Sequence, residues 1–197
     1  KKNILIVGSS MAPDAARIIG NLYPDYHYAL NWAGGCLPMR DVSKKFKSGK
    51  RAKECQRLNN LRFDPKYFSK FDGVIIKTLK ADSVFISEYV KHLKRNGMDN
   101  ILIFGNYLRN KHMMSDLYLK YTDKKNVIDA IESKSLITDD LTYDQEMFKL
   151  SKEQHINFIS IRDYACSKES GCKLFIGDYP YSWDRHHFSG PILQKRG

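Results

Sequence analysis

Residues 3–19 constrain the fold of this chain more than any other stretch. Residues 4–7 are a continuous apolar run, which is typical of a strand buried on both faces of a parallel sheet. Residues 8–10 read Gly-Ser-Ser, and apolar side chains then recur at helical spacing over residues 15–19. The stretch predicts a strand, a tight turn and a helix, with Ser10 at the carboxyl edge of the sheet.

The position of Ser10 allows two interpretations. Unpaired N–H groups and the helix dipole favour negative charge at a helix N-terminus, so an oxyanion formed beside a nucleophilic Ser10 would be stabilised there. Alternatively, Ser9 or Ser10 is an N-cap that accepts a hydrogen bond from the first helical turn, while Gly8 relaxes the turn. This stretch alone leaves both interpretations open.

The remaining pattern predicts alternating strands and helices. Further strands are expected over residues 26–30, 73–78, 101–104 and 156–161, and helices over residues 83–96 and 143–153 and most of 112–154. Such alternation indicates a doubly wound α/β sheet with right-handed crossovers. At 197 residues and 42% hydrophobic content, a single domain over residues 1–197 is expected, excised from a longer membrane protein.

The helix over residues 83–96 illustrates the core pattern. Its apolar spacing predicts that Val84, Ile86, Val90 and Leu93 face inward. Gly97 is expected to end this helix.

Charge favours anionic partners. The chain carries 33 Lys+Arg against 22 Asp+Glu, a net charge of +11, with the densest basic run over residues 44–53. Such a field attracts nucleic acid, anionic glycan or lipid headgroups, although a run of this kind is more often a solvated surface. No nucleic-acid-binding signature accompanies it, so no nucleic-acid partner is expected. There is also no signal-peptide pattern and no apolar run long enough to cross a bilayer.

Four cysteines form two local pairs in the sequence. Cys36 and Cys55 make one pair and Cys166 and Cys172 the other, and neither has the C-x-x-C spacing of a zinc or redox site. Two disulfides would allow three connectivities and would indicate an oxidising compartment. Four buried thiols in a cytosolic protein remain the alternative on spacing alone.

Two further segments contain candidate functional residues. Gly34 and Gly35 follow the second predicted strand, where they either present N–H groups to a ligand or only turn the chain. Near the end of the chain, Asp184 and His187 are spaced so that a carboxylate can orient an imidazole acting as a general base. His186 and His187 can also ligate a metal, but no supporting ligand set is apparent, so we expect neither metal nor cofactor.

Together these segments resemble the SGNH (GDSL-type) hydrolase family, and most of all the extracytoplasmic SGNH domain fused behind membrane-bound acyltransferase family 3 proteins. Residues 8–10 match the family's Gly-Asp-Ser, and residues 35–38 match its Gly-Cys-x-Pro turn. A cysteine hairpin at residues 166–172 precedes residues 184–189, which match Asp-x-x-His-Leu-Ser. The resemblance implies a three-layer α/β/α sandwich with a five-stranded, mainly parallel sheet.

The resemblance also implies roles for individual residues. Ser10 would be the nucleophile, His187 the general base and Asp184 the carboxylate that orients it. The backbone N–H groups of Ser10 and Gly35 would contribute to an oxyanion hole, with Asn106 as a further donor.

By the same resemblance, the disulfides would be Cys36–Cys55 and Cys166–Cys172, and the protein would be periplasmic.

Two positions depart from the family pattern. Ser9 stands where the family has Asp, which removes a carboxylate and leaves the nucleophilic hydroxyl in place. The family's Gly-x-Asn-Asp after the third strand has no counterpart in residues 78–82. Asn106, after the fourth strand, is the candidate replacement, and capping of the next segment is its alternative role.

The expected function is O-acyl transfer, specifically acetyl transfer, to a bacterial cell-surface glycan such as lipopolysaccharide O-antigen. A fused membrane acyltransferase domain would deliver the acetyl donor, and the surface polysaccharide would be the acceptor. The alternatives are a carbohydrate O-acetyl esterase, a catalytically weak glycan-binding or accessory module, and, from charge alone, a cytosolic nucleotide- or nucleic-acid-binding domain.

Overall fold

The computed structural model describes residues 1–46, 48–78, 82–106, 109–110, 113–120, 123, 125–126, 136–137, 140–162, 166–167, 171–172, 175–176, 179–182, 184 and 187. It comprises two compact units, and each is described by itself. The first contains residues 1–104 and 145–159, and the second contains residues 105–144 and 160–197. The single domain predicted over residues 1–197 stays a prediction.

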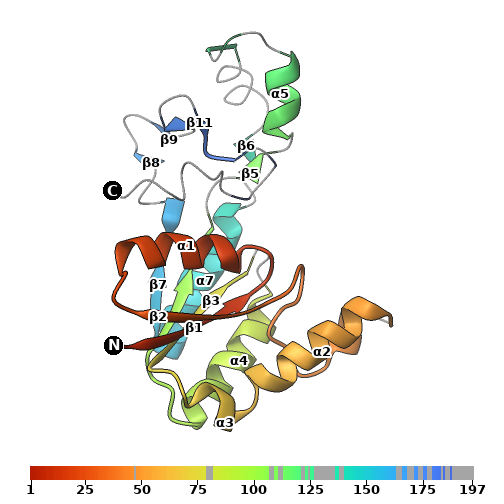
Figure 1. Cartoon of the computed structure of the whole chain (residues 1–197), viewed down its shortest axis with the longest axis vertical. Coiled ribbons are helices and arrows are strands. Elements are labelled where there is room, and N and C mark those ends of the chain that lie inside the picture. The colour runs from red at the N-terminus through yellow and green to blue at the C-terminus, as the bar shows by residue number, and fades with distance from the viewer. Residues whose placement is uncertain are drawn as a thin grey trace. The chain divides into compact units, whose positions relative to one another are not determined.

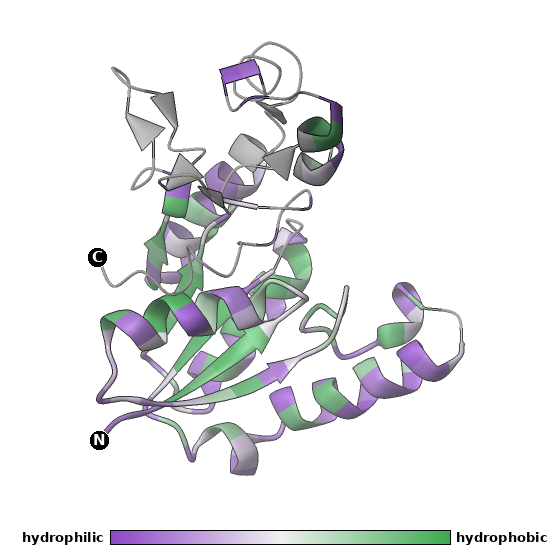
Figure 2. Ribbon diagram, turned by 45° about the horizontal axis from the view of Figure 1, so that its top comes forward, coloured by the Kyte–Doolittle hydropathy of each residue, from purple (hydrophilic) through white to green (hydrophobic). Residues whose placement is uncertain are grey.

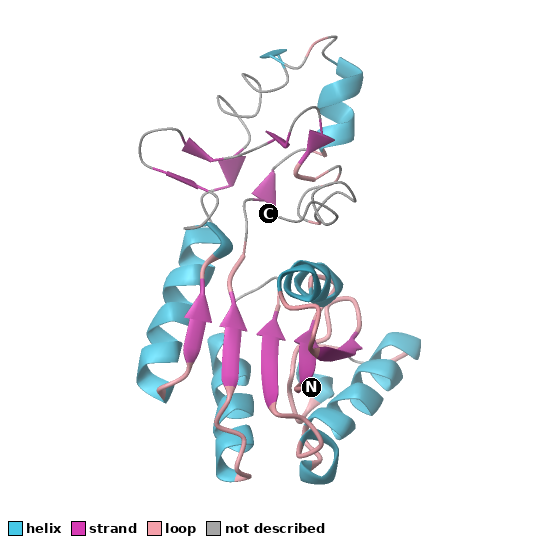
Figure 3. Ribbon diagram, turned by 60° about the vertical axis from the view of Figure 1, so that its left-hand side comes forward, coloured by secondary structure: helices cyan, strands magenta, loops and turns pink. Residues whose placement is uncertain are grey.

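A five-stranded parallel sheet forms the centre of the first unit. Its order is β2-β1-β3-β4-β7, and every neighbouring pair is parallel (Figure 3). The strands are β1 (Asn3–Gly8), β2 (His27–Trp32), β3 (Gly73–Lys77), β4 (Ile101–Phe104) and β7 (Asn157–Ile159). All five strands lie where the apolar runs predict them, to within one or two residues at each end.

Helices cover both faces of this sheet. Helix α1 (Ala12–Leu22) lies on one face, and α2 (Lys50–Arg62), α3 (Pro65–Phe68) and α4 (Ser83–Arg95) lie on the other (Figure 1). The 3-10 turn η1 (Val42–Lys44) precedes α2, and α7 (Asp140–Gln154) is joined to α4 by the Lys94 ammonium, which donates to the Gln154 carbonyl over 2.7 Å. The connection from β1 to β2 contains α1, and the connection from β2 to β3 runs the opposite way along the sheet and contains α2. Because both crossovers are right-handed, the two helices lie on opposite faces.

The core consists of the central strands and the helix faces that cover them. Leu5, Ile6 and Val7 of β1 are fully buried, as is Ile76 of β3. These strands are largely green, and therefore hydrophobic, in Figure 2. Burial on both faces explains why β1 and β3 are continuous apolar runs rather than alternating patterns.

Helix α4 confirms most of its predicted core face. Ile86, Val90 and Leu93 are buried, but the prediction for Val84 is wrong, because its side chain is 71% exposed. Val84 precedes Ile86 by two residues, about 200° around the helix, so the two side chains face opposite directions. Tyr89 is buried on the inward face instead.

The end of α4 lies where it was predicted, whereas the start of α7 does not. Gly97 follows α4 with φ +83°, a conformation that ends the helix as predicted. Helix α7 begins at Asp140, three residues before the predicted start at residue 143. Within the residues that the structure describes, no helix is both long enough and apolar enough to cross a membrane.

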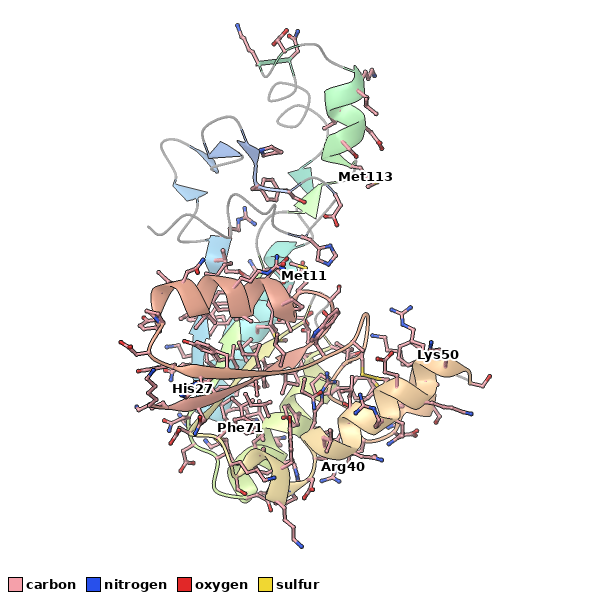
Figure 4. All side chains as sticks on the ribbon, in the orientation of Figure 1. Met11, His27, Arg40, Lys50, Phe71 and Met113 are labelled. Carbon is pink, nitrogen blue, oxygen red and sulfur yellow. A yellow bond between two sulfur atoms is a disulfide. The ribbon has the colours of Figure 1, made fainter. Side chains whose placement is uncertain are left out.

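The Cys36–Cys55 disulfide is formed (Figure 4). It joins the segment after β2 to the middle of α2, with 5.5 Å between the two Cα atoms. This disulfide indicates an oxidising compartment outside the cytosol, and it argues against the alternative of four free thiols.

The second unit contains short elements. They are β5 (Arg109–Asn110), α5 (Met114–Lys120), β6 (Leu136–Ile137), β8 (Cys166–Ser167), β9 (Gly171–Cys172), β10 (Phe175–Ile176) and β11 (Tyr179–Pro180). Strands β8 and β9 pair with Cys166 directly opposite Cys172, so the predicted hairpin is present. The sulfur atoms of this second predicted disulfide lie outside the described part of the chain.

Candidate active site

The turn between β1 and α1 is held close to β3. The Ser9 N–H donates to the Lys77 carbonyl over 3.2 Å, and a Cβ at Gly8 would lie 1.8 Å from that same oxygen. Only glycine therefore fits at position 8. The contact places Ser9 and Ser10 at the carboxyl edge of the sheet, where the apolar run of β1 predicts them.

Neither serine caps α1 with its side chain. The N-cap of this helix is Met11, labelled in Figure 4, and it makes no side-chain cap hydrogen bond. The Ser9 backbone carbonyl accepts from the Ala12 N–H over 3.1 Å, while the buried Ser9 hydroxyl has no hydrogen-bond partner among the described residues. The capping interpretation of this turn is therefore wrong. Ser10 is half-buried.

The Gly34–Gly35 turn has a defined backbone geometry. The Cys36 N–H donates to the Ala33 carbonyl over 3.0 Å, and Gly35 has φ +70°. The Arg51 guanidinium, extending from α2, donates to the Gly34 carbonyl through Nε over 2.8 Å and also through Nη2. The turn is thus fixed by its own hydrogen bond and by a side chain of α2.

Arg62 connects this region to the turn between β1 and α1. Its side chain is fully buried, and its Nη2 donates to the Gly8 and Asn31 carbonyls over 2.9 Å each. Nε donates to the Asn31 side-chain oxygen over 2.9 Å, and Nη1 donates to the Cys36 carbonyl over 3.4 Å and to the Asn59 side-chain oxygen over 2.9 Å. One guanidinium therefore joins the ends of β1 and β2 to the Gly35–Cys36 segment.

Arg62 is not among the predicted site residues, although its spacing contains a signal. Arg62 follows Cys55 by seven residues and so lies on the same face of α2 as the disulfide. Burial lowers the pKa of Arg62 to about 10, so the guanidinium is still charged at neutral pH. Asn31 and Asn59, its partners, were also not singled out.

Asp184 and His187 form a pair within the second unit. The Asp184 Oδ2 atom lies 2.6 Å from His187 Nδ1, and Oδ1 accepts from the His187 backbone N–H over 2.8 Å. The Ser182 hydroxyl donates to Oδ1 over 3.0 Å. Because the carboxylate engages Nδ1, proton exchange with a substrate would go through Nε2. The three-residue spacing predicted this arrangement.

Asn106 is buried and lies two residues after the end of β4. Its backbone N–H donates to Asp144 Oδ1 over 2.9 Å, and Asp144 Oδ2 accepts from the Ser160 hydroxyl over 2.7 Å. Asp144, which is not among the predicted site residues, thus holds the backbone at Asn106. The proposed role of the Asn106 side chain as an oxyanion donor stays a prediction.

The structure describes the two halves of the predicted site separately. Ser10 and Gly35 belong to the first unit, whereas Asn106, Asp184 and His187 belong to the second. The meeting of Ser10 with His187 stays a prediction. His186, the second histidine of the possible metal pair, and residues 79–81, where the family's Asn would be expected, lie outside the described residues.

Comparison with solved structures identifies the fold. The periplasmic domain of the lipopolysaccharide acetyltransferase of Salmonella ser. Paratyphi A superposes with a TM-score of 0.73 at 17% identity, over 98% of this chain and 79% of that one. A "putative acylhydrolase" from Bacteroides fragilis superposes with a TM-score of 0.54 at 12% identity, over 96% and 80% of the two chains.

No protein-family model and no curated protein sequence matches the chain. The α/β architecture expected from the SGNH hydrolase resemblance is nevertheless confirmed by the parallel sheet and by these neighbours.

Proposed function

We propose that this chain is an O-acyltransferase domain that acetylates a bacterial cell-surface glycan through a covalent intermediate on Ser10. The observation that carries the proposal is the Asp184–His187 pair, in which a carboxylate orients an imidazole as a general base requires. The position of Ser10 at the carboxyl edge of the sheet supports the same chemistry. So do the two structural neighbours, one an acetyltransferase domain and the other named as an acylhydrolase.

The reaction has two steps. In the first, the Ser10 hydroxyl attacks the carbonyl carbon of the acetyl donor while His187 Nε2 accepts the hydroxyl proton. The oxyanion is stabilised by the N–H groups of Ser10 and Gly35, and its collapse expels the leaving group, which receives the proton from His187. In the second, a sugar hydroxyl attacks the acetyl-enzyme and gives its proton to His187. The bond between the acetyl group and Ser10 then breaks, which leaves the acetyl group as an ester on the sugar, and His187 returns the proton to Ser10.

The partners follow from the same proposal. A fused membrane acyltransferase domain would supply the acetyl group, and the acceptor would be a surface polysaccharide such as the O-antigen of lipopolysaccharide. The disulfide and the net charge of +11 support a periplasmic domain that meets an anionic glycan. If water attacked the acetyl-enzyme in place of the sugar, the same intermediate would be hydrolysed and the domain would act as a carbohydrate O-acetyl esterase.

Hydrolysis of p-nitrophenyl acetate tests the proposal. Ser10→Ala and His187→Ala should each abolish turnover, and Ser9→Ala is the matched control, because it removes a hydroxyl one residue away. Mass spectrometry of the acetylated protein should place the adduct on Ser10. Equal turnover by the wild type and all three variants would contradict the proposal and favour a glycan-binding module.

A further inference from the structure

The Gly34–Gly35 peptide lies at the centre of a β-turn that admits two orientations. Gly35 has a positive φ and Gly34 does not, which defines a type II turn across Ala33 to Cys36. A type I turn closes the same hydrogen bond with the central peptide rotated by roughly 180°. With glycine at both central positions, no Cβ favours one orientation over the other.

The orientation of this peptide decides where the Gly35 N–H points. In a trans peptide the C=O and the N–H lie on opposite sides. The Arg51 guanidinium holds the Gly34 carbonyl on the side of α2, with its Nε at 2.8 Å. The Gly35 N–H is consequently directed away from α2.

Helix α2 presents three anchors to this turn from one face. Arg51, Cys55 and Arg62 are separated by 4 and 7 residues, so they lie along one side of the helix. Cys55 is bonded to Cys36, and Arg62 donates to the Cys36 carbonyl. These two anchors fix Cys36, the last residue of the turn. Among the described residues, only Arg51 contacts the oxygen of the central peptide.

We propose that Arg51 is a positioning residue of the oxyanion hole, which holds the Gly34–Gly35 peptide in the one orientation that offers the Gly35 N–H to a developing oxyanion. The inference rests on the proposed function. Arg51 itself does not contact the reacting atoms. The oxyanion develops during the chemical step. Loss of the hydrogen bonds from Arg51 to the Gly34 carbonyl should therefore lower kcat and leave KM nearly unchanged.

Variants of the 197-residue chain test the kinetic part with p-nitrophenyl acetate. We expect Arg51→Ala to lower kcat by about tenfold or more, with KM changed by less than about twofold. Arg51→Lys should recover part of kcat, because an ammonium can still donate one hydrogen bond to the Gly34 carbonyl. Lys53→Ala is the matched control: it removes the same charge from an exposed position on α2 and should leave kcat within about twofold.

The NMR resonance of the Gly35 amide tests the geometric part without any catalysis. It should shift in Arg51→Ala and stay in place in Lys53→Ala, because only the first variant releases the peptide. An unchanged Gly35 resonance in Arg51→Ala overturns the proposal, whether or not kcat falls. A kcat equal to that of Lys53→Ala also overturns it. If the wild type shows no Ser10-dependent turnover, the proposed function fails separately, and the resonance still decides whether Arg51 holds the peptide.

Discussion

The Arg62 guanidinium donates a hydrogen bond to the backbone carbonyl of Gly8 over 2.9 Å, although 54 residues separate them in sequence. Gly8 ends β1 two residues before Ser10, and Arg62 ends α2. The contact therefore ties the proposed nucleophile turn to the helix that also anchors the Gly34–Gly35 turn.

Replacing Arg62 should destabilise the protein strongly. Arg62→Met keeps much of the side-chain volume but leaves the buried Gly8 and Asn31 carbonyls without their donor, at a cost of about 3 kcal/mol or more in the free energy of unfolding. Urea denaturation measures this cost. Arg57→Met, an exposed position on the same helix, should change it by less than about 0.5 kcal/mol. A similar small change for Arg62→Met would contradict the assigned network.

Removing the charge of Asp184 should impair catalysis without unfolding the protein. In Asp184→Asn, the amide no longer offers a carboxylate to His187 Nδ1, so the imidazole loses both its orientation and the charge that stabilises its protonated form. We expect kcat for ester hydrolysis to fall by about a thousandfold or more. Ser182→Ala removes only a hydrogen-bond donor to the same carboxylate and should cost about tenfold or less. Equal losses in both variants would argue against the pair as the general base.

Loss of the Cys36–Cys55 disulfide should lower stability by about 3 kcal/mol, because the bond closes a loop with a sequence separation of 19. Urea denaturation of the Cys36→Ala/Cys55→Ala double variant measures this directly, and the wild type with reducing agent provides the comparison. Thiol titration of the unfolded, unreduced wild type should find neither of these two cysteines reactive. Full reactivity of both would contradict the disulfide.

Acidification should lower the stability of the folded protein, because His92 becomes protonated. Burial, followed by the neighbouring Arg40 charge, lowers the pKa of His92 below its usual 6.5. Its Nε2 faces the Phe63 carbonyl at 3.0 Å, so the ring accepts the Arg40 hydrogen bond at Nδ1 over 2.9 Å when it is neutral.

The direction of this pH dependence follows from proton binding to His92. Below pH 6.5 the unfolded chain binds a proton at His92 more readily than the folded one, so stability falls as pH decreases toward the lowered pKa. The melting temperature of the wild type should therefore drop more between pH 7 and pH 5 than that of His92→Gln. Parallel pH profiles for the two proteins would show that His92 contributes nothing to this dependence.

The central sheet could be predicted from local sequence patterns. The apolar runs of β1 and β3 indicate strands buried on both faces, and glycine at position 8 marks the turn that follows β1. The local Asp184–His187 pair could also be predicted, because the two side chains meet within three residues. These features depend on neighbours close in sequence, so their pattern is visible without the fold.

The contacts of Arg62 and Arg51 form only in the folded chain. The spacing of Arg62 places it on the disulfide face of α2, but its partners could not be predicted, because they are oxygen atoms of segments far away in the sequence that converge only in the folded chain. The hold of Arg51 on Gly34 likewise depends on how α2 packs beside the turn. Hydrogen bonds between segments tens of residues apart leave no local spacing in the sequence, and they exist only once the sheet has fixed the ends of its strands.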